Sequence, residues 1–180
     1  MKYILLTALL LSTPLMAKPY EVNQAKSQVT FTLSHAGNEF TGEFTEWNAD
    51  INFDADNLET SSVTVTFNTA SAKTGDMMYD GTLPTKNWFD VAGYPTATFK
   101  STSLKKTDDG FVANGDLTIK DITNPISFNF TLMGDAPAHM RASFPVNRLS
   151  HNIGKEADPT GEWVSKDIMM NVHIEASPVK

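Results

Sequence analysis

The chain has 180 residues, a formal net charge of −7 and no cysteine. This length fits one domain whose core removes roughly 70% of the unfolded surface from water. The acidic excess argues against nucleic-acid binding, which needs a basic face to neutralise phosphate groups. The lack of cysteine excludes thiol nucleophiles and cysteine-based zinc sites.

The N-terminal segment has the pattern of a secretory signal peptide. Lys2 supplies the positive charge, residues 4–11 form a short apolar run, and Ala17 is the expected last residue before cleavage. We therefore expect a signal peptide at residues 1–17, a single domain at residues 18–180 and a periplasmic location. A membrane anchor and a disordered tail are the alternatives. No later segment is apolar for long enough to span a bilayer, so we expect no stable membrane insertion.

Apolar and polar residues alternate through most of the chain after residue 20. Such alternation gives each strand one apolar and one polar face, which is typical of antiparallel sheets. Polar, glycine and proline clusters at 54–57, 108–110, 121–125 and 134–137 predict turns. The expected fold is all-β, either a barrel of about eight strands or two packed sheets. The alternating segments are 29–33, 40–44, 49–53, 63–67, 97–99, 117–119, 126–132, 140–146 and 168–174.

Residues 69–91 lack this alternation. We expect a short helix from about Met77 to Leu83, capped by Thr74 or Asp76 and ended by Pro84. Its two methionines and the nearby Trp88 and Phe89 need apolar cover. The segment is therefore expected to lie over the open end of a barrel; a surface loop whose apolar residues patch the core is the alternative.

The sequence shows no catalytic or metal-binding constellation. It has no nucleophile elbow or phosphate-binding loop, and its histidines at 35, 139, 151 and 173 lie far apart. His173 alternates with Val172 and Ile174, which predicts a solvated strand position. We therefore expect no enzyme activity, no metal and no cofactor. An enzyme acting on a lipid or sugar would need convergent polar groups in a cleft.

Several ordered motifs resemble the YceI-like family, the polyisoprenoid-binding periplasmic proteins. The similarity extends from about Tyr20 to Ser177. It includes Ser27, Val29 and Phe31 ahead of His35, then Gly42, Phe44 and Trp47, Thr74-Gly75, Trp88-Phe89-Asp90-Val91, Tyr94-Pro95, Gly115-Asp116-Leu117-Thr118-Ile119 and Thr123-Asn124-Pro125-Ile126. The resemblance implies a lipocalin-like antiparallel barrel whose apolar tunnel holds a polyprenyl chain, an isoprenoid quinone or a fatty amide.

The sequence departs from the family pattern at one element. Where the family usually has Arg-Asp-x-His-Leu, this chain has Tyr79-Asp80-Gly81-Thr82-Leu83, so the Arg and His are missing. Asp80 and Leu83 match the pattern. His35 and Asp80 are the candidate contacts for a ligand head group.

We therefore expect a periplasmic carrier that sequesters a long lipid inside the barrel. The alternative is a β-sandwich adhesion or interaction module with a filled core. A homodimer is compatible with the sequence, which leaves the oligomeric state open. The composition, with 11 Phe and 8 Met, suits either a cavity or an ordinary core. Met77, Met78, Trp88 and Phe89 are the expected gate. The expected tunnel lining comprises Val29, Phe31, Leu33, Phe40, Phe44, Phe67, Met77, Met78, Trp88, Phe89, Phe99, Leu117, Ile119, Phe128, Phe130, Met140, Phe144, Ile168 and Met170.

Overall fold

The structure is a computed structural model that describes residues 17–179. The expected signal peptide, apart from Ala17, lies outside the described residues. None of the helices in residues 17–179 has the length and apolarity that crossing a bilayer requires.

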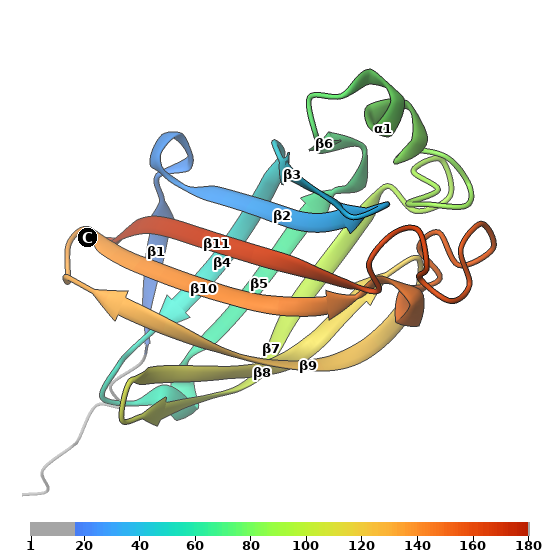
Figure 1. Ribbon diagram of the computed structural model, residues 1–180. Helices are drawn as coiled ribbons and strands as arrows, with labels where there is room; N and C mark the ends of the chain where they lie inside the picture. Colours follow the sequence, from blue (N-terminus) through green and yellow to red (C-terminus); the bar gives the residue numbers. More distant parts are fainter. Residues whose placement is uncertain (1–16, 180) are drawn as a thin grey trace, which may run out of the picture.

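Antiparallel strands make up most of the described chain, with one α-helix and four short 3₁₀ turns among residues 17–179 (Figure 1). The helix α1 spans Met77–Thr82. The 3₁₀ turns are η1 (Gln24–Lys26), η2 (Leu58–Thr60), η3 (Thr69–Ser71) and η4 (Arg148–His151). The strands are β1 (Lys18–Val22), β2 (Gln28–His35), β3 (Asn38–Phe44), β4 (Trp47–Phe53), β5 (Ser62–Asn68), β6 (Ala72–Lys73), β7 (Thr96–Thr107), β8 (Gly110–Ile119), β9 (Ile122–Met133), β10 (Ala138–Asn147) and β11 (Asp167–Pro178).

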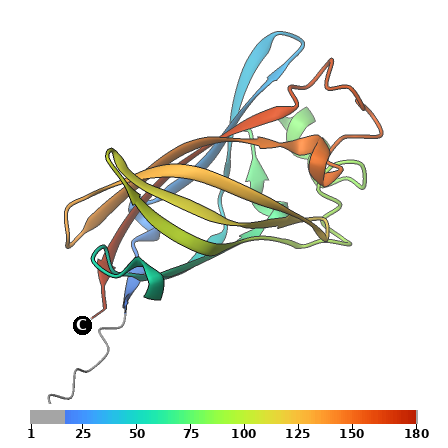
Figure 2. The ribbon, with the colours of Figure 1, turned by 90° about the horizontal axis from the view of Figure 1, so that it is seen from below.

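Eight of these strands close into a barrel in the order β1-β4-β5-β7-β8-β9-β10-β11. The ring closes where β1 pairs with the end of β11, from Tyr20 opposite Pro178 to Val22 opposite Ala176. The first half of β11 pairs instead with β2, and β3 and β6 continue the sheet outward from there. Figures 1 and 2 show this extension beside the ring. The predicted antiparallel barrel is confirmed, and the β-sandwich alternative is wrong.

The alternating segments all lie within strands, but two strand boundaries differ from the expectation. β1 is unexpected because it is short and contains Lys18, Pro19 and Glu21, which hide its pattern. The turn expected at 121–125 is shorter, since β9 begins at Ile122 and Pro125 lies inside the strand, opposite Asp116 of β8.

The ladder between β9 and β10 explains why a proline fits inside β9. It covers only four residue pairs, from Phe130 opposite Ala142 to Met133 opposite His139. Residues 122–129 of β9 and 143–147 of β10 pair with β8 and β11, respectively, but not with each other. Pro125, in the first of these stretches, and Pro145, in the second, therefore remove no hydrogen bond from a β9–β10 ladder. We call this stretch the β9–β10 seam.

One end of the barrel is covered by two irregular segments. Asp76 caps α1 by accepting hydrogen bonds from the backbone N–H groups of Met78 (2.8 Å) and Tyr79 (3.3 Å), which confirms the predicted short helix. Residues 83–95 and 148–166 then pack against the barrel end through the buried Leu83, Phe89, Ile153 and Val164. Figures 1 and 2 show α1 and the second segment at the same end, away from β1 and the C-terminus.

Candidate functional site

The barrel interior contains an apolar cavity of about 180 Å³. Some aromatic side chains contact one another, and the rings of Phe128 and Phe144 stack across the β9–β10 seam with their centroids 4.1 Å apart. An open volume nevertheless remains between the barrel walls. The inward-facing aromatic residues therefore do not fill the barrel completely. The predicted residues that line this cavity are Val29, Phe31, Leu33, Phe44, Phe67, Trp88, Phe89, Phe99, Leu117, Ile119, Phe128, Met140, Phe144, Ile168 and Met170. Their contact with a ligand stays a prediction.

Two smaller volumes adjoin the central cavity at its ends. A cavity of about 80 Å³ lies toward β1 and shares Ile51, Phe99, Met140 and other wall residues with the central one. A cavity of about 200 Å³ lies under α1 and shares Leu33, Leu83 and Trp88 with it. The three cavities thus form a row from the covered end of the barrel toward the chain termini.

The remaining predicted residues lie at the ends of this row or outside it. Phe130 lines the cavity near β1, and Phe40 and Met78 line the cavity under α1. Met77 lines none of the three cavities, and its side chain is 92% exposed. Of the residues expected to form a gate, Trp88 therefore lies between two cavities, whereas Met77 faces solvent.

Sequence reasoning missed part of the wall. Ile51, Val63, Val65, Ala97 and Ile126 follow the same strand alternation and could have been included on that signal. The same holds for Ala49, Val146, Val172 and Ile174, and the other residues it missed are Trp47, Leu83, Arg148 and Ile153. Among these, Arg148 and Ile153 belong to the irregular end segment, where no periodicity indicates the inward direction.

Arg148 closes the wall at the covered end. Its side chain is 2% exposed, and its guanidinium lies 5.6 Å from the centroid of the Trp88 ring. Nε donates to Ser165 O, Nη1 donates to Ile153 O, and Nη2 donates to Val164 O and to Asp158 Oδ2. The hydrogen bonds of Arg148 therefore hold the 148–166 segment in place.

Asp158 is held as an anion beside Arg148. Burial raises the pKa of the Asp158 carboxyl group, but backbone N–H groups of Val164, Glu162 and Trp163 and the Arg148 charge lower it further than burial raises it. Among residues 17–179, Arg148 is the one lysine or arginine that lines any of the three cavities, and no aspartate or glutamate lines them.

The two candidate head-group contacts occupy different surroundings. His35, at the end of β2, lines the cavity under α1, and its Nδ1 lies 2.6 Å from the hydroxyl of Tyr79. Asp80 does not line that cavity. Its carboxylate accepts hydrogen bonds from the backbone N–H (2.6 Å) and hydroxyl (2.9 Å) of Thr74, and these bonds lower its pKa.

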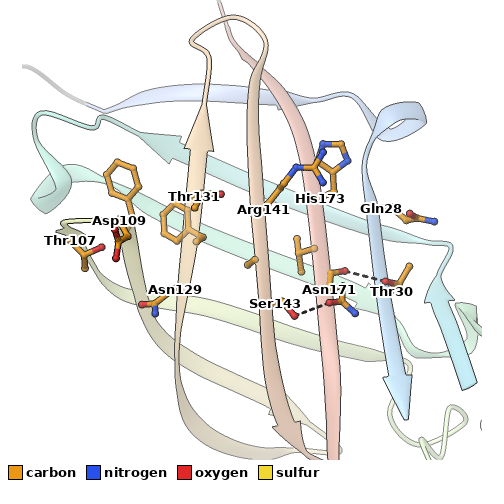
Figure 3. Close-up of a pocket in the computed structure, with 14 residues that line it drawn as sticks. Gln28, Thr30, Thr107, Asp109, Asn129, Thr131, Arg141, Ser143, Asn171 and His173 are labelled. Carbon is orange, nitrogen blue, oxygen red and sulfur yellow. Dashed lines mark hydrogen bonds between the residues drawn. The ribbon is translucent and has the colours of Figure 1, made fainter. Parts of the chain in front are cut away.

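The outer face of the barrel carries a wider and more open depression of about 730 Å³ (Figure 3). Polar side chains from neighbouring strands line it, among them Gln28, Arg141 and Asn171. Some satisfy one another, since Ser143 Oγ donates to Asn171 Oδ1 at 2.8 Å. His173 lies on this outer face as expected, but it is not freely solvated, because its Nε2 is buried without a hydrogen-bond partner among residues 17–179. The enclosed interior is the better-defined candidate site.

Comparison with known proteins identifies the family. Residues 20–176 match the YceI-like domain. The chain belongs to the YceI-like family. The resemblance found in the sequence is thereby confirmed, and the barrel is that of a YceI-like protein.

Relatives of this YceI-like chain occur in several bacteria. It is 36% identical over 133 residues to a UPF0312 protein of Pseudomonas savastanoi pv. phaseolicola (strain 1448A / Race 6), covering 72% of this chain and 69% of that protein. It is 32% identical over 152 residues to the Protein YceI of Escherichia coli O157:H7, covering 80% of this chain and 78% of that protein.

Solved structures show the same architecture. BcnA of Burkholderia cenocepacia superposes with a TM-score of 0.82 at 26% identity, covering 87% of this chain and 100% of that one. A polyisoprenoid binding domain from Saccharophagus degradans, implicated in plant cell wall breakdown, superposes with a TM-score of 0.68 at 14% identity, covering 90% of this chain and 99% of that one. The second likeness is one of fold.

Proposed function

We propose that this protein is a periplasmic carrier that holds one long apolar lipid inside its barrel. The observation that carries the proposal is the enclosed central cavity, whose walls are apolar side chains apart from Arg148. A water molecule needs two to four polar partners, which these walls do not offer. An apolar ligand is therefore the occupant that fits.

The size of the cavity supports this reading. An engineered apolar cavity of about 150 Å³ in another protein stays dry and binds benzene. The central cavity alone, at about 180 Å³, exceeds that volume, and the adjoining cavities extend it at both ends. Each buried methylene group contributes about 0.8 kcal/mol of transfer free energy, so a long chain can offset the cost of its own ordering.

The row is long enough for an extended hydrocarbon chain. Along β10 and into η4, cavity-lining residues extend from Ala138 in the cavity near β1 to Arg148 at the covered end. These ten steps span about 33 Å along the strand, or about 25 Å along the barrel axis after the usual tilt. The row can therefore hold the extended chain of a polyisoprenoid, an isoprenoid quinone tail or a fatty amide.

The relatives and the wall chemistry favour binding over catalysis. The Saccharophagus degradans domain that shares the fold is described as binding polyisoprenoid. In residues 17–179, the cavity walls contain no carboxylate that could act as an acid or base. We therefore propose a binding protein without enzyme activity.

The periplasmic location is part of the same proposal. It rests on the positive charge at Lys2, the apolar run at residues 4–11 and the expected cleavage after Ala17. Separating periplasmic from cytoplasmic fractions and sequencing the N-terminus of the protein tests it. Recovery of the uncleaved chain in the cytoplasm would contradict it.

Native mass spectrometry of protein isolated from its own cells, followed by lipid extraction, tests lipid binding directly. A complex heavier than the polypeptide that releases a long-chain lipid is the expected result. Val65→Phe places a ring in the cavity wall and should lower lipid occupancy. The neighbouring Thr66, which lies outside the cavity walls, provides the matched control Thr66→Phe. Lipid-free protein from cells and no binding to added isoprenoid lipids would refute the proposal.

A further inference from the structure

The cavity under α1 is the polar end of an otherwise apolar row. It is lined by His35 and Phe40 from the β2–β3 hairpin, by Thr74, by Met78, Tyr79 and Thr82 of α1, by Val164, and by the residues it shares with the central cavity. The central cavity and the one near β1 offer no comparable group of polar side chains. A lipid that fills the row would therefore place any polar group under α1.

His35 and Tyr79 form a fixed pair in this cavity. Besides the hydrogen bond of 2.6 Å, the two rings meet edge to face with their centroids 5.5 Å apart. The Phe40 ring packs edge to face on Tyr79 at 4.7 Å and supports it from the other hairpin strand. The pair thus joins β2 to α1 and presents its polar atoms at a defined place.

This pair has one hydrogen-bond donor to spare, whichever tautomer of neutral His35 is present. If the Tyr79 hydroxyl donates to Nδ1, then His35 carries its proton on Nε2 and can donate from there. If Nδ1–H donates to the Tyr79 oxygen, then the hydroxyl proton of Tyr79 is the spare donor. Either arrangement suits a ligand oxygen that accepts one hydrogen bond.

The other hydroxyl groups that line this cavity already donate hydrogen bonds within the protein. Thr74 Oγ1 donates to Asp80 Oδ1 at 2.9 Å, and Thr82 Oγ1 donates to Met78 O at 2.8 Å. The spare donor for a ligand therefore comes from the His35–Tyr79 pair.

The same walls are poorly suited to a charged head group. Phosphate groups in proteins are held by arginine, lysine or several backbone N–H groups, and an unpaired buried charge is costly. Within residues 17–179, no lysine or arginine lines the cavity under α1, and Arg148 in the central cavity donates to Asp158 and to three backbone carbonyls.

Building on the proposed function, we propose that the His35–Tyr79 pair binds the oxygen of an uncharged head group, a hydroxyl or carbonyl, and that the protein selects such lipids over their phosphorylated forms. The head group lies under α1, and the hydrocarbon tail extends past Trp88 into the central cavity. At this place α1 presents the uncharged Tyr79 beside His35, which agrees with a preference for neutral ligands.

Three ligands with one carbon skeleton test this proposal on delipidated protein: geranylgeraniol, geranylgeranyl phosphate and the corresponding hydrocarbon without the hydroxyl group. Dissociation constants can be measured by quenching of tryptophan fluorescence. We expect the alcohol to bind about three- to tenfold more tightly than the hydrocarbon, as one hydrogen bond allows. We expect the phosphate to bind more weakly than the alcohol by tenfold or more.

Two variants locate the head group. Tyr79→Phe keeps the ring packing and leaves His35 as the one remaining donor, so it shows which member of the pair donates: the preference for the alcohol falls if the Tyr79 hydroxyl is the spare donor and stays if His35 Nε2 is. The double variant Tyr79→Phe/His35→Phe removes both donors and should abolish the preference while hydrocarbon binding stays within about twofold. Tyr94→Phe removes a hydroxyl group that lies outside the three cavities and should change neither affinity.

The outcomes separate this proposal from the proposed function. Phosphate binding as tight as alcohol binding, or a preference for the alcohol that the double variant retains, would overturn the head-group assignment while leaving lipid binding intact. If wild-type protein binds none of the three ligands, the proposed function itself fails. Thermal unfolding of each variant identifies any that do not fold, and Tyr79→Phe/His35→Leu, which also lacks both donors, then replaces the double variant.

Discussion

Arg148 Nη2 and Asp158 Oδ2 lie 2.7 Å apart with both side chains buried at the covered end of the barrel. The pair joins the first residue after β10 to the middle of the segment that closes this end. It also places the Arg148 guanidinium beside Trp88, which divides the central cavity from the one under α1. The ion pair thereby links the stability of the cover to the shape of the site.

Removing one member of the Arg148–Asp158 ion pair should destabilise the fold. Asp158→Ala leaves the buried Arg148 charge without its carboxylate, and we expect the free energy of unfolding to fall by about 3 to 5 kcal/mol. Denaturant unfolding followed by circular dichroism measures this. Asp135→Ala removes an exposed carboxylate from a turn and serves as the control. A decrease in the free energy of unfolding of less than about 1 kcal/mol, which is typical of solvent-exposed salt bridges, would show that this ion pair contributes little to stability.

His151 should make the protein less stable in mild acid. Burial lowers the pKa of His151, and the hydrogen bond of Nδ1 to Ile122 O only partly raises it again. The unfolded chain therefore takes up the proton at higher pH than the folded chain does. The stabilising contribution is complete above the unfolded pKa of about 6.5 and is lost as the pH falls from there through the lowered folded value.

Unfolding free energies measured from about pH 7.5 down to about pH 5 check this expectation. His151→Gln removes the titrating group and should give a flatter pH profile than the wild type. Profiles with the same slope would mean that other groups cause the pH dependence.

Trp88 and Met78 should control how fast a bound lipid leaves. Trp88 lies between two cavities and Met78 lines the cavity under α1, with 63% of its surface exposed. Trp88→Ala combined with Met78→Ala opens this end, and we expect faster release of lipid to acceptor vesicles from an intact barrel. Met133→Ala, an exposed methionine outside the three cavities, is the control. Unchanged release would mean that the segment only packs against the core.

Gly42 should be intolerant of a side chain. A methyl group there would collide with the Phe31 ring and would lie 2.6 Å from Lys73 O. Because Phe31 lines the central cavity, Gly42→Ala should push the ring inward, destabilise the fold by about 1 to 3 kcal/mol and lower lipid capacity.

Gly81→Ala is the matched control for this substitution. The position lies in α1 with open space around it, so alanine should be neutral or stabilise by up to about 1 kcal/mol. Parallel measurements of unfolding and lipid binding compare the two variants. Equal lipid binding by both would show that Phe31 moves without narrowing the cavity.

Much of the barrel could be predicted because strand alternation is a local signal. The alternate spacing of Val29, Phe31 and Leu33 predicts that their side chains point into the barrel, and all three line the central cavity. β1 gives no such signal, since its five residues include two charges and Pro19, and its place depends on partners far along the chain. The sequence predicts a turn at Pro125, but the strand accepts this proline because residues 122–129 of β9 pair with β8 and not with β10. Which neighbouring strand is paired cannot be inferred from the local sequence.

The site was harder to predict where irregular segments contribute. The inward direction of Arg148 depends on the closing segment that supplies Ser165, Ile153 and Asp158 as partners, which no periodicity reveals. His35 was recognised as a head-group candidate, but its pairing with Tyr79 across 44 positions requires the fold. Met77 is exposed because it is the first residue of the short helix α1 and faces solvent. A cluster of apolar residues in the sequence does not indicate this direction.

The β9–β10 seam makes the barrel wall unequal in stiffness. Backbone amides on its two sides lack mutual hydrogen bonds, so wall closure there relies on side-chain contacts such as the Phe128–Phe144 stack. Aromatic contacts can slide by an ångström at little cost, whereas a continuous ladder cannot. The wall can therefore widen along this seam more easily than along the long continuous ladders β8–β9 and β10–β11, so the bore of the barrel can change there while those ladders keep their register.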